Sequence, residues 1–185
     1  MKLLLLAVGL SLLCILQAHH GNAENAEQSL SGDWRSARLT SDDPSLIEEG
    51  GKFRLYIRNI NEHKRGDLVG HFFMKKFDRC IPIMMVGAKT DTKGAYHVYY
   101  YGTNDLHLSV QKNDYVIFVA HNSYHGKEAV IVNLFTKTGE VSEEAETAFK
   151  NICTELGLKE ENTVDMTKDG CSIIDWLDFP SQERF

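Results

Sequence analysis

An all-β fold is predicted for this sequence: eight antiparallel strands that form an up-and-down barrel, with one C-terminal α-helix packed against the outside. Short segments of β character, separated by turn residues, follow one another over residues 34–137, which is typical of a sandwich or a barrel. Residues 116–120 and 129–132 are apolar on both faces and therefore need cover on both sides. An amphipathic helix follows them and can supply the outer cover. Closure into a barrel also removes the exposed sheet edges.

The first residues have the composition of an export signal. Lys2 precedes an apolar run over residues 3–16 that is too short for a stable bilayer span, and small residues follow at Ala18 and Ala23. We expect residues 1–18 to be a signal peptide, with cleavage after Ala23 or an uncleaved anchor as the alternatives. Residues 19–30 are polar and are expected to form a flexible arm. The mature protein is therefore predicted to be secreted.

The charge balance narrows the possible partners. The chain has a formal net charge of −6 at pH 7, and removal of Lys2 with the signal makes it one unit more negative. An acidic surface repels phosphate backbones and the chain has no basic run, so nucleic acid is not an expected partner. No second apolar run of membrane length follows, so a membrane is not an expected partner either.

Eight strands are expected between turn segments rich in Gly, Asn, Asp and Ser. They span residues 34–40, 52–60, 67–77, 81–88, 95–101, 106–110, 115–121 and 128–136. In the second of them, Phe53, Leu55 and Ile57 alternate with more polar neighbours, which is the period of a half-buried strand. The apolar side of this strand should line the barrel interior.

The outer helix is expected to begin after Ser142. This residue is a suitable N-cap, and two glutamates follow it in the first turn, where the helix dipole favours negative charge. An apolar stripe at helical spacing consists of Ala145, Phe149, Ile152 and Leu156. Gly157 is suited to the position that follows the helix C-terminus.

Four cysteines are present, and Cys14 leaves with the signal. Three cysteines in an oxidising compartment indicate one disulfide and one free thiol. Cys153 lies in the predicted helix and should be the buried, inert thiol. Cys80 and Cys171 then form the bridge, which is worth roughly 2–4 kcal/mol. The folded domain is expected to span residues 31–171. The hydrophobic tail 172–185 either packs on the barrel or contacts a partner.

Three short motifs lie at the ends of predicted strands. They are Gly32-Asp33-Trp34 before the first strand, Asn113-Asp114-Tyr115 before the seventh and Phe135-Thr136-Lys137 at the end of the eighth. These motifs resemble the lipocalin signatures Gly-x-Trp, Thr-Asp-Tyr and a final Arg, with Asn for Thr and Lys for Arg. The resemblance implies that Trp34 plugs the closed end, that Asp114 bonds to turn amides there and that Lys137 lies over the indole. The expected structural residues are Gly32, Trp34, Asp114, Tyr115 and Lys137.

Further motifs are similar to the odorant-binding and urinary-protein branch of the lipocalins. They are the segment 48–55, Gly94-Ala95-Tyr96 followed by Tyr100-Tyr101-Gly102, the pair Cys80 and Cys171, and the run 149–162. The resemblance covers nearly the whole mature chain, from about residue 31 to residue 171.

Alternation along the predicted strands also selects the side chains that face the interior. The inward set, which matches the pocket positions implied by the lipocalin resemblance, is Phe53, Leu55, Ile57, Phe72, Met85, Val98, Tyr100, Leu106, Phe118, Ala120, Ile131 and Phe135. An eight-stranded barrel can hold one small ligand, and an apolar wall gains roughly 25 cal/mol per Å2 of ligand area removed from water. The wall carries no charge, so we expect a neutral ligand, oriented by Tyr100 or by a group such as Asn133. A dry, filled core is the alternative.

The resemblance implies a secreted carrier of an odorant-like or pheromone-like molecule and not an enzyme. The alternatives are a carrier of larger lipids such as fatty acids or retinoids, and an interaction protein that acts through its tail. Catalysis by a cysteine inside the barrel is not expected, because Cys153 lies on the outer helix and the other two mature cysteines are bridged. No cofactor is expected, and the histidine spacings fit no common metal site. A receptor and a homodimer both stay open as partners.

Overall fold

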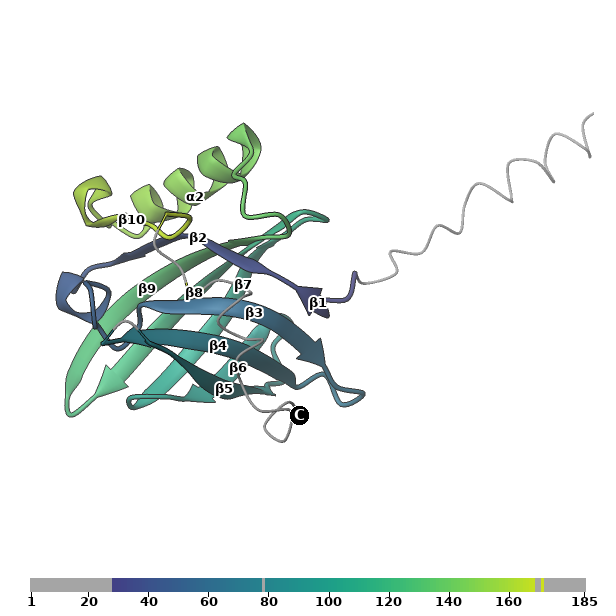
Figure 1. The fold of residues 1–185 in the computed structure, drawn as a ribbon. Coiled ribbons are helices and arrows are strands. Elements are labelled where there is room, and N and C mark those ends of the chain that lie inside the picture. Colours follow the sequence, from purple (N-terminus) through teal and green to yellow (C-terminus); the bar gives the residue numbers. More distant parts are fainter. Residues whose placement is uncertain (1–27, 78, 169–170, 172–185) are drawn as a thin grey trace, which may run out of the picture.

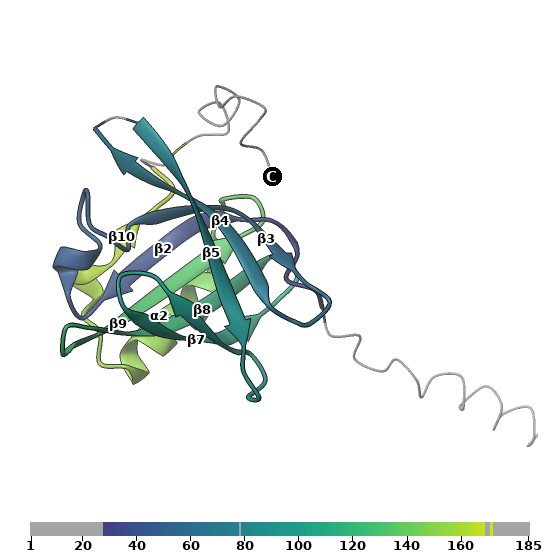
Figure 2. The ribbon, with the colours of Figure 1, turned by 90° about the horizontal axis from the view of Figure 1, so that it is seen from below.

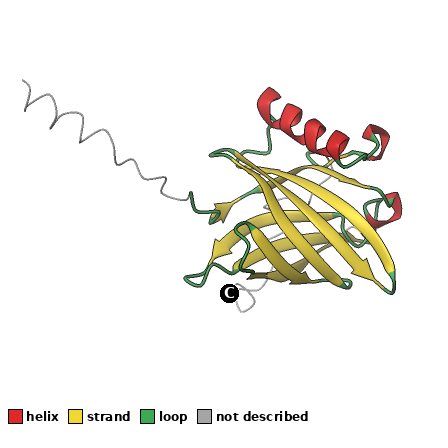
Figure 3. Ribbon diagram, turned by 180° about the vertical axis from the view of Figure 1, so that it is seen from behind, coloured by secondary structure: helices red, strands yellow, loops and turns green. Residues whose placement is uncertain are grey.

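The computed structural model describes residues 28–77, 79–168 and 171, and in this part a curled antiparallel sheet carries one helix on its outside (Figure 1, Figure 3). The elements are β1 (Gly32–Asp33), β2 (Arg35–Ser41), η1 (Pro44–Leu46), β3 (Leu55–Glu62), β4 (Leu68–Lys76), β5 (Arg79–Lys89), β6 (Ala95–Tyr99), β7 (Thr103–Gln111), β8 (Tyr115–Tyr124), β9 (Lys127–Thr136), α2 (Glu143–Glu155), η2 (Glu160–Asn162) and β10 (Val164–Asp165). The expected signal peptide, most of the expected arm and the tail 172–185 lie outside the described residues.

The strand order is β1-β3-β4-β5-β6-β7-β8-β9-β2-β10, with antiparallel pairing throughout. The N-terminal strands close the barrel, because β1 pairs with β3 on one side and β2 pairs with β9 on the other. Strands β2 to β9 correspond to the eight predicted strands, so the predicted barrel is confirmed. Several boundaries differ: β7 begins at Thr103 instead of residue 106, β8 continues to Tyr124 instead of residue 121, and β5 is longer at both ends. Two other differences have local reasons. Residues 51–54 form a turn rather than the start of β3, and β6 ends before Tyr101, whose φ is +44°.

A bulge in β3 changes which side chains point inward. Ile57 pairs with Phe72 and Asn59 pairs with His71, so Arg58 is an extra residue in the ladder. The insertion reverses the alternation beyond it. Ile57 and Ile60 therefore both reach the interior cluster, although they are three residues apart.

Helix α2 begins as predicted, with the Ser142 hydroxyl accepting a hydrogen bond from the Ala145 amide. It ends in a Schellman turn in which Gly157, at φ +68°, is followed by Leu158, whose amide donates to the Cys153 carbonyl. The buried side of the helix consists of Ala145, Phe149 and Cys153. The expected contact from Leu156 was wrong: its side chain is 37% exposed, because the turn brings Leu158 back onto the cluster instead.

The predicted disulfide between Cys80 and Cys171 is present, with 5.7 Å between the Cα atoms, and it ties the end of the described chain to the start of β5. Cys153 is the free cysteine among the described residues and is buried. Burial raises the pKa of its thiol to about 11. No described helix is both long and apolar enough to cross a bilayer.

The expected arm 19–30 ends earlier than predicted, because its last residue belongs to the folded domain. Leu30 is buried in the interior cluster beside Trp34, and its carbonyl accepts a hydrogen bond of 2.8 Å from the Trp34 indole N–H. A buried indole N–H needs a hydrogen-bond acceptor, and the Leu30 backbone supplies it. Sequence polarity gave no sign of the contact.

Candidate functional site

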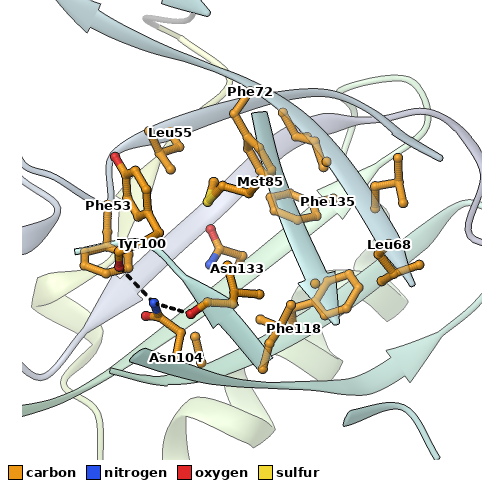
Figure 4. Close-up of a pocket in the computed structure, with 17 residues that line it drawn as sticks. Phe53, Leu55, Leu68, Phe72, Met85, Tyr100, Asn104, Phe118, Asn133 and Phe135 are labelled. Carbon is orange, nitrogen blue, oxygen red and sulfur yellow. Dashed lines mark hydrogen bonds between the residues drawn. The ribbon is translucent and has the colours of Figure 1, made fainter. Parts of the chain in front are cut away.

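The barrel encloses a cavity of about 110 Å3 (Figure 4). Its wall is formed mainly by aliphatic and aromatic side chains from strands β3 to β9 and from the segments before β3 and after β6. The lining residues are Phe53, Leu55, Ile57, Ile60, Leu68, Gly70, Phe72, Met85, Gly87, Val98, Tyr100, Asn104, Leu106, Phe118, Ala120, Asn133 and Phe135. No lining residue carries a charge, so the cavity is a poor solvent for an ion.

All but one of the predicted inward side chains line this cavity. The exception is Ile131, which points inward but is completely buried among Leu39, Ile47 and Ala129. Ile47, from the loop between β2 and β3, belongs to the same buried cluster as Ile131, so Ile131 packs into this cluster and is not part of the cavity surface. The sequence pattern predicts strand alternation but not the path of this loop.

Five further lining residues were not predicted: Ile60, Leu68, Gly70, Gly87 and Asn104. For four of them the signal was present, because Gly70, Gly87 and Asn104 lie two residues, and Leu68 four residues, from a predicted lining position on the same strand. Ile60 could not be found in this way, since the bulge at Arg58 reverses the alternation. The two glycines keep part of the wall free of side chains. A Cβ atom at Gly70 would lie 2.4 Å from the Phe72 ring, so glycine is needed for that ring position.

Two asparagines supply amide groups to the wall, and they differ in how far they are paired. The Asn104 amide donates to the carbonyls of Val98, at 3.1 Å, and Tyr100, at 2.8 Å, and its oxygen accepts from Asn122. These bonds hold the turn between β6 and β7. The Asn133 amide, drawn among the lining side chains in Figure 4, makes no hydrogen bond with any described residue. It is therefore available to a ligand.

Aromatic side chains gather at the end of the barrel opposite Trp34. The Tyr100 hydroxyl donates to the Lys52 carbonyl over 2.7 Å, and its ring meets Phe53 edge to face with 5.5 Å between centroids. Burial, with a smaller contribution from Tyr101, raises the pKa of Tyr100, so its phenol stays neutral. This hydrogen bond joins the segment before β3 to the residues after β6 at the mouth of the barrel. Because the Tyr100 hydroxyl already donates to the Lys52 carbonyl, it is less available for orienting a ligand than we expected.

The opposite end is closed by Trp34. The Lys137 ammonium lies 3.6 Å from the centroid of the Trp34 ring, the arrangement expected from the sequence motif. Burial lowers the pKa of Lys137, and the nearby Asp33 carboxylate partly opposes that shift. Gly32 enters this end with φ at +125°, a conformation that side chains other than glycine rarely adopt.

Within the described part of the chain, the motif Asn113-Asp114-Tyr115 does not make the side-chain hydrogen bonds that we expected from Asp114. The Asp114 main-chain carbonyl accepts a hydrogen bond from the Lys137 amide at 2.9 Å, whereas its exposed carboxylate makes no hydrogen bond with a described residue. Tyr115 points outward and is buried beneath α2, where its hydroxyl donates to Glu144 over 3.2 Å. This tyrosine therefore fixes the helix to the barrel.

Among the described residues, no group of three or more His, Cys, Asp or Glu side chains is placed to hold a metal ion. The interior of the barrel likewise lacks the nucleophile and acid–base pair that a hydrolytic or transfer reaction needs. The arrangement is suited to enclosing an apolar molecule.

The sequence matches the Lipocalin / cytosolic fatty-acid binding protein family over residues 31–170. It is 37% identical over 181 residues to trichosurin of Trichosurus vulpecula, which covers 92% of this chain and 100% of the relative. It is 32% identical over 173 residues to major urinary protein 18 of Mus musculus, with 90% and 93% of the two chains covered.

Solved structures agree with these sequence matches. The structure of the possum milk whey lipocalin trichosurin with bound 4-ethylphenol has a TM-score of 0.73 at 38% identity and covers 77% of this chain and all of that one. A bovine odorant-binding protein, solved as a deswapped triple mutant, has a TM-score of 0.70 at 26% identity and covers 76% and 95% of the two chains. Both similarities extend over the barrel that contains the cavity.

Proposed function

Because this chain belongs to the lipocalin family and is a carrier of small hydrophobic molecules rather than an enzyme, we propose that it is secreted and carries one neutral ligand of odorant or pheromone size. The observation that carries the proposal is the apolar cavity inside the barrel, whose wall holds one side-chain amide, that of Asn133, without a hydrogen bond to a described residue. The ligand contacts that we assign are the lining residues, with Ile131 left out because it is covered.

The cavity volume favours a ligand of about one aromatic ring. An apolar cavity of about 150 Å3 in another protein holds benzene, whereas pockets for drug-sized ligands measure about 300–1,000 Å3. The cavity here, at about 110 Å3, is nearer the smaller case. Fatty acids and retinoids would need the barrel to widen, so larger lipids are the less favoured cargo.

The polarity of the wall favours one neutral polar group on the ligand. The Asn133 amide can donate or accept a hydrogen bond, and the surrounding rings of Phe72, Phe118 and Phe135 can enclose an apolar body. Alkylphenols, short-chain alcohols and ketones have this character. The 4-ethylphenol in the related trichosurin structure is one example, which supports the choice of this class as test ligands.

Secretion is supported by three observations. Residues 1–18 have the composition of a signal peptide, the Cys80–Cys171 disulfide suits an oxidising compartment, and the relative trichosurin is described as a milk whey protein. Mass spectrometry of the protein from the medium of expressing cells tests this point. We expect a mature N-terminus at residue 19 or 24, and a chain that stays in the cell with residue 1 intact would contradict it.

Ligand binding is tested by titrating the oxidised protein with a fluorescent apolar probe and displacing the probe with a series of competitors. We expect one site, displaced best by single-ring or short-chain neutral molecules. Ala120→Trp fills the cavity from β8 and should abolish uptake, whereas His121→Trp, the adjacent outward position on the same strand, should not. Displacement mainly by oleate or retinol would identify a larger lipid as cargo. No uptake by folded protein would mean that the barrel is a filled core.

A further inference from the structure

One apolar surface of the barrel has no cover among the described residues. On the outer side of β5 lie Pro82, Met84 and Val86, at the two-residue spacing of one strand face. Tyr99 lies beside them, because Val98 pairs with Gly87 and both of these residues point inward. Met84 is 64% exposed, Val86 49% and Tyr99 81%. We call these four residues the β5 face.

The backbone of β5 is also open at this place. Strand β6 pairs only with residues 87–89 of β5, so residues 81–86 have β4 as a partner on one side and no described strand on the other. Figure 2 shows β4 and β5 projecting together beyond the neighbouring strands. An apolar face beside an open strand edge is a site of unwanted association unless something covers it.

The end of the described chain already covers the adjacent part of the sheet. Asp165 of β10 pairs with β2, and Met166 is buried with Tyr56 of β3 and Phe73 of β4. Cys171 then reaches Cys80 at the start of β5 through the disulfide. The described residues Asp165, Met166 and Cys171 thus contact β2, then β3 and β4, and then the start of β5 at the head of the β5 face.

The next residues in the sequence have the composition and length to continue this cover. Residues 172–179 read Ser-Ile-Ile-Asp-Trp-Leu-Asp-Phe. They can extend over about 26 Å, and the six-residue step from Cys80 to Val86 spans about 20 Å. Their two aspartates are opposite in charge to Lys75 and Arg79, which lie near Cys80. In the β4–β5 ladder, Lys75 pairs with Cys80 and Arg79 pairs with Lys76.

We propose that residues 172–179 of the same chain bind the β5 face, with Trp176 and Leu177 against Met84 and Val86. This contact is independent of the ligand cavity, since the β5 face points away from it. In this arrangement the tail covers the apolar face and the open edge of β5 within the same chain. A second copy of the chain and an external protein are the competing occupants, and the experiment separates them.

Trp176 is the natural reporter. The chain contains two tryptophans, and Trp34 is fully buried, so the difference between the full mature chain and a chain that ends at Cys171 isolates the emission of Trp176. We expect that emission to be blue-shifted and protected from iodide, compared with a free peptide of residues 172–185. The double variant Met84→Ser/Val86→Ser should lose both effects. Tyr124→Ser, at an exposed aromatic at the end of β8, should retain them.

Hydrogen exchange gives a second readout that does not depend on the substitutions. Truncation after Cys171 should speed amide exchange in residues 79–86 and leave β8 unchanged. Protection of Trp176 that disappears on dilution, together with a dimer in sedimentation, would show that the tail binds a second copy and would overturn the proposal. A tail as exposed as the free peptide in the intact monomer would overturn it as well, and would leave an external partner as the candidate for the β5 face.

Discussion

Replacing Asn133 with leucine removes the unpaired amide of the cavity and keeps a side chain of similar size. A neutral intramolecular hydrogen bond contributes about 0.5–1.5 kcal/mol net, and 1.4 kcal/mol corresponds to a factor of about ten in affinity. We therefore expect Asn133→Leu to weaken the binding of 4-ethylphenol by about two- to twelvefold. Ethylbenzene, which lacks the hydroxyl, should bind the variant at least as well as it binds the wild-type protein.

The hydrogen bond to Asn133 is measured by the difference between the affinity losses of 4-ethylphenol and ethylbenzene, because a change in cavity shape affects the binding of both ligands. Isothermal titration of both ligands with both proteins gives a double-mutant cycle between the ligand hydroxyl and the Asn133 amide. Val98→Ala serves as the control: it alters an apolar part of the wall and should weaken both ligands alike. Equal losses for the two ligands in Asn133→Leu would refute the assignment of Asn133 as the polar contact.

Three further predictions concern the mouth, the helix and the free thiol. Tyr100→Phe removes the hydrogen bond to the Lys52 carbonyl and should speed ligand dissociation in stopped-flow displacement; an unchanged rate would mean that this bond does not close the mouth. Ser142→Ala removes the N-cap of α2 and should lower the free energy of unfolding by about 1 kcal/mol in urea titrations, whereas Ser45→Ala, at an exposed position in the short helix η1, should change it less. Cys153 should resist thiol reagents until the protein unfolds. Because burial raises its pKa from 9.0 to about 11, the stability contributed by the neutral thiol is complete below pH 9 and is lost as the pH rises toward 11, a loss that Cys153→Ala should lack.

The regular part of the cavity could be predicted because strand alternation has a fixed period. Once Leu55 and Phe118 were assigned to the interior, residues two apart on the same strand followed, and the structure places them on the cavity wall. The cap of α2 at Ser142 could be predicted from the residues next to it, and the bridge between Cys80 and Cys171 from the number and positions of the cysteines. These features depend on short spacings that a single sequence displays directly.

The remainder depends on contacts between residues distant in the sequence. Ile131 is buried in a cluster that includes Ile47, from a loop whose path no local pattern specifies. Ile60 reaches the cavity only through the bulge at Arg58. The Tyr100 hydroxyl, expected to face a ligand, instead bonds to the backbone of Lys52. Each difference arises where a loop or an irregular pair, rather than the strand period, decides the direction of a side chain.

A crystal structure of the oxidised protein grown with 4-ethylphenol tests the central claim most directly. We expect one molecule inside the barrel, its ring among Phe72, Phe118 and Phe135 and its hydroxyl about 2.7–3.2 Å from the Asn133 amide. A cavity that stays empty at saturating ligand, or a ligand bound only on the outer surface, would contradict the carrier function proposed for this barrel.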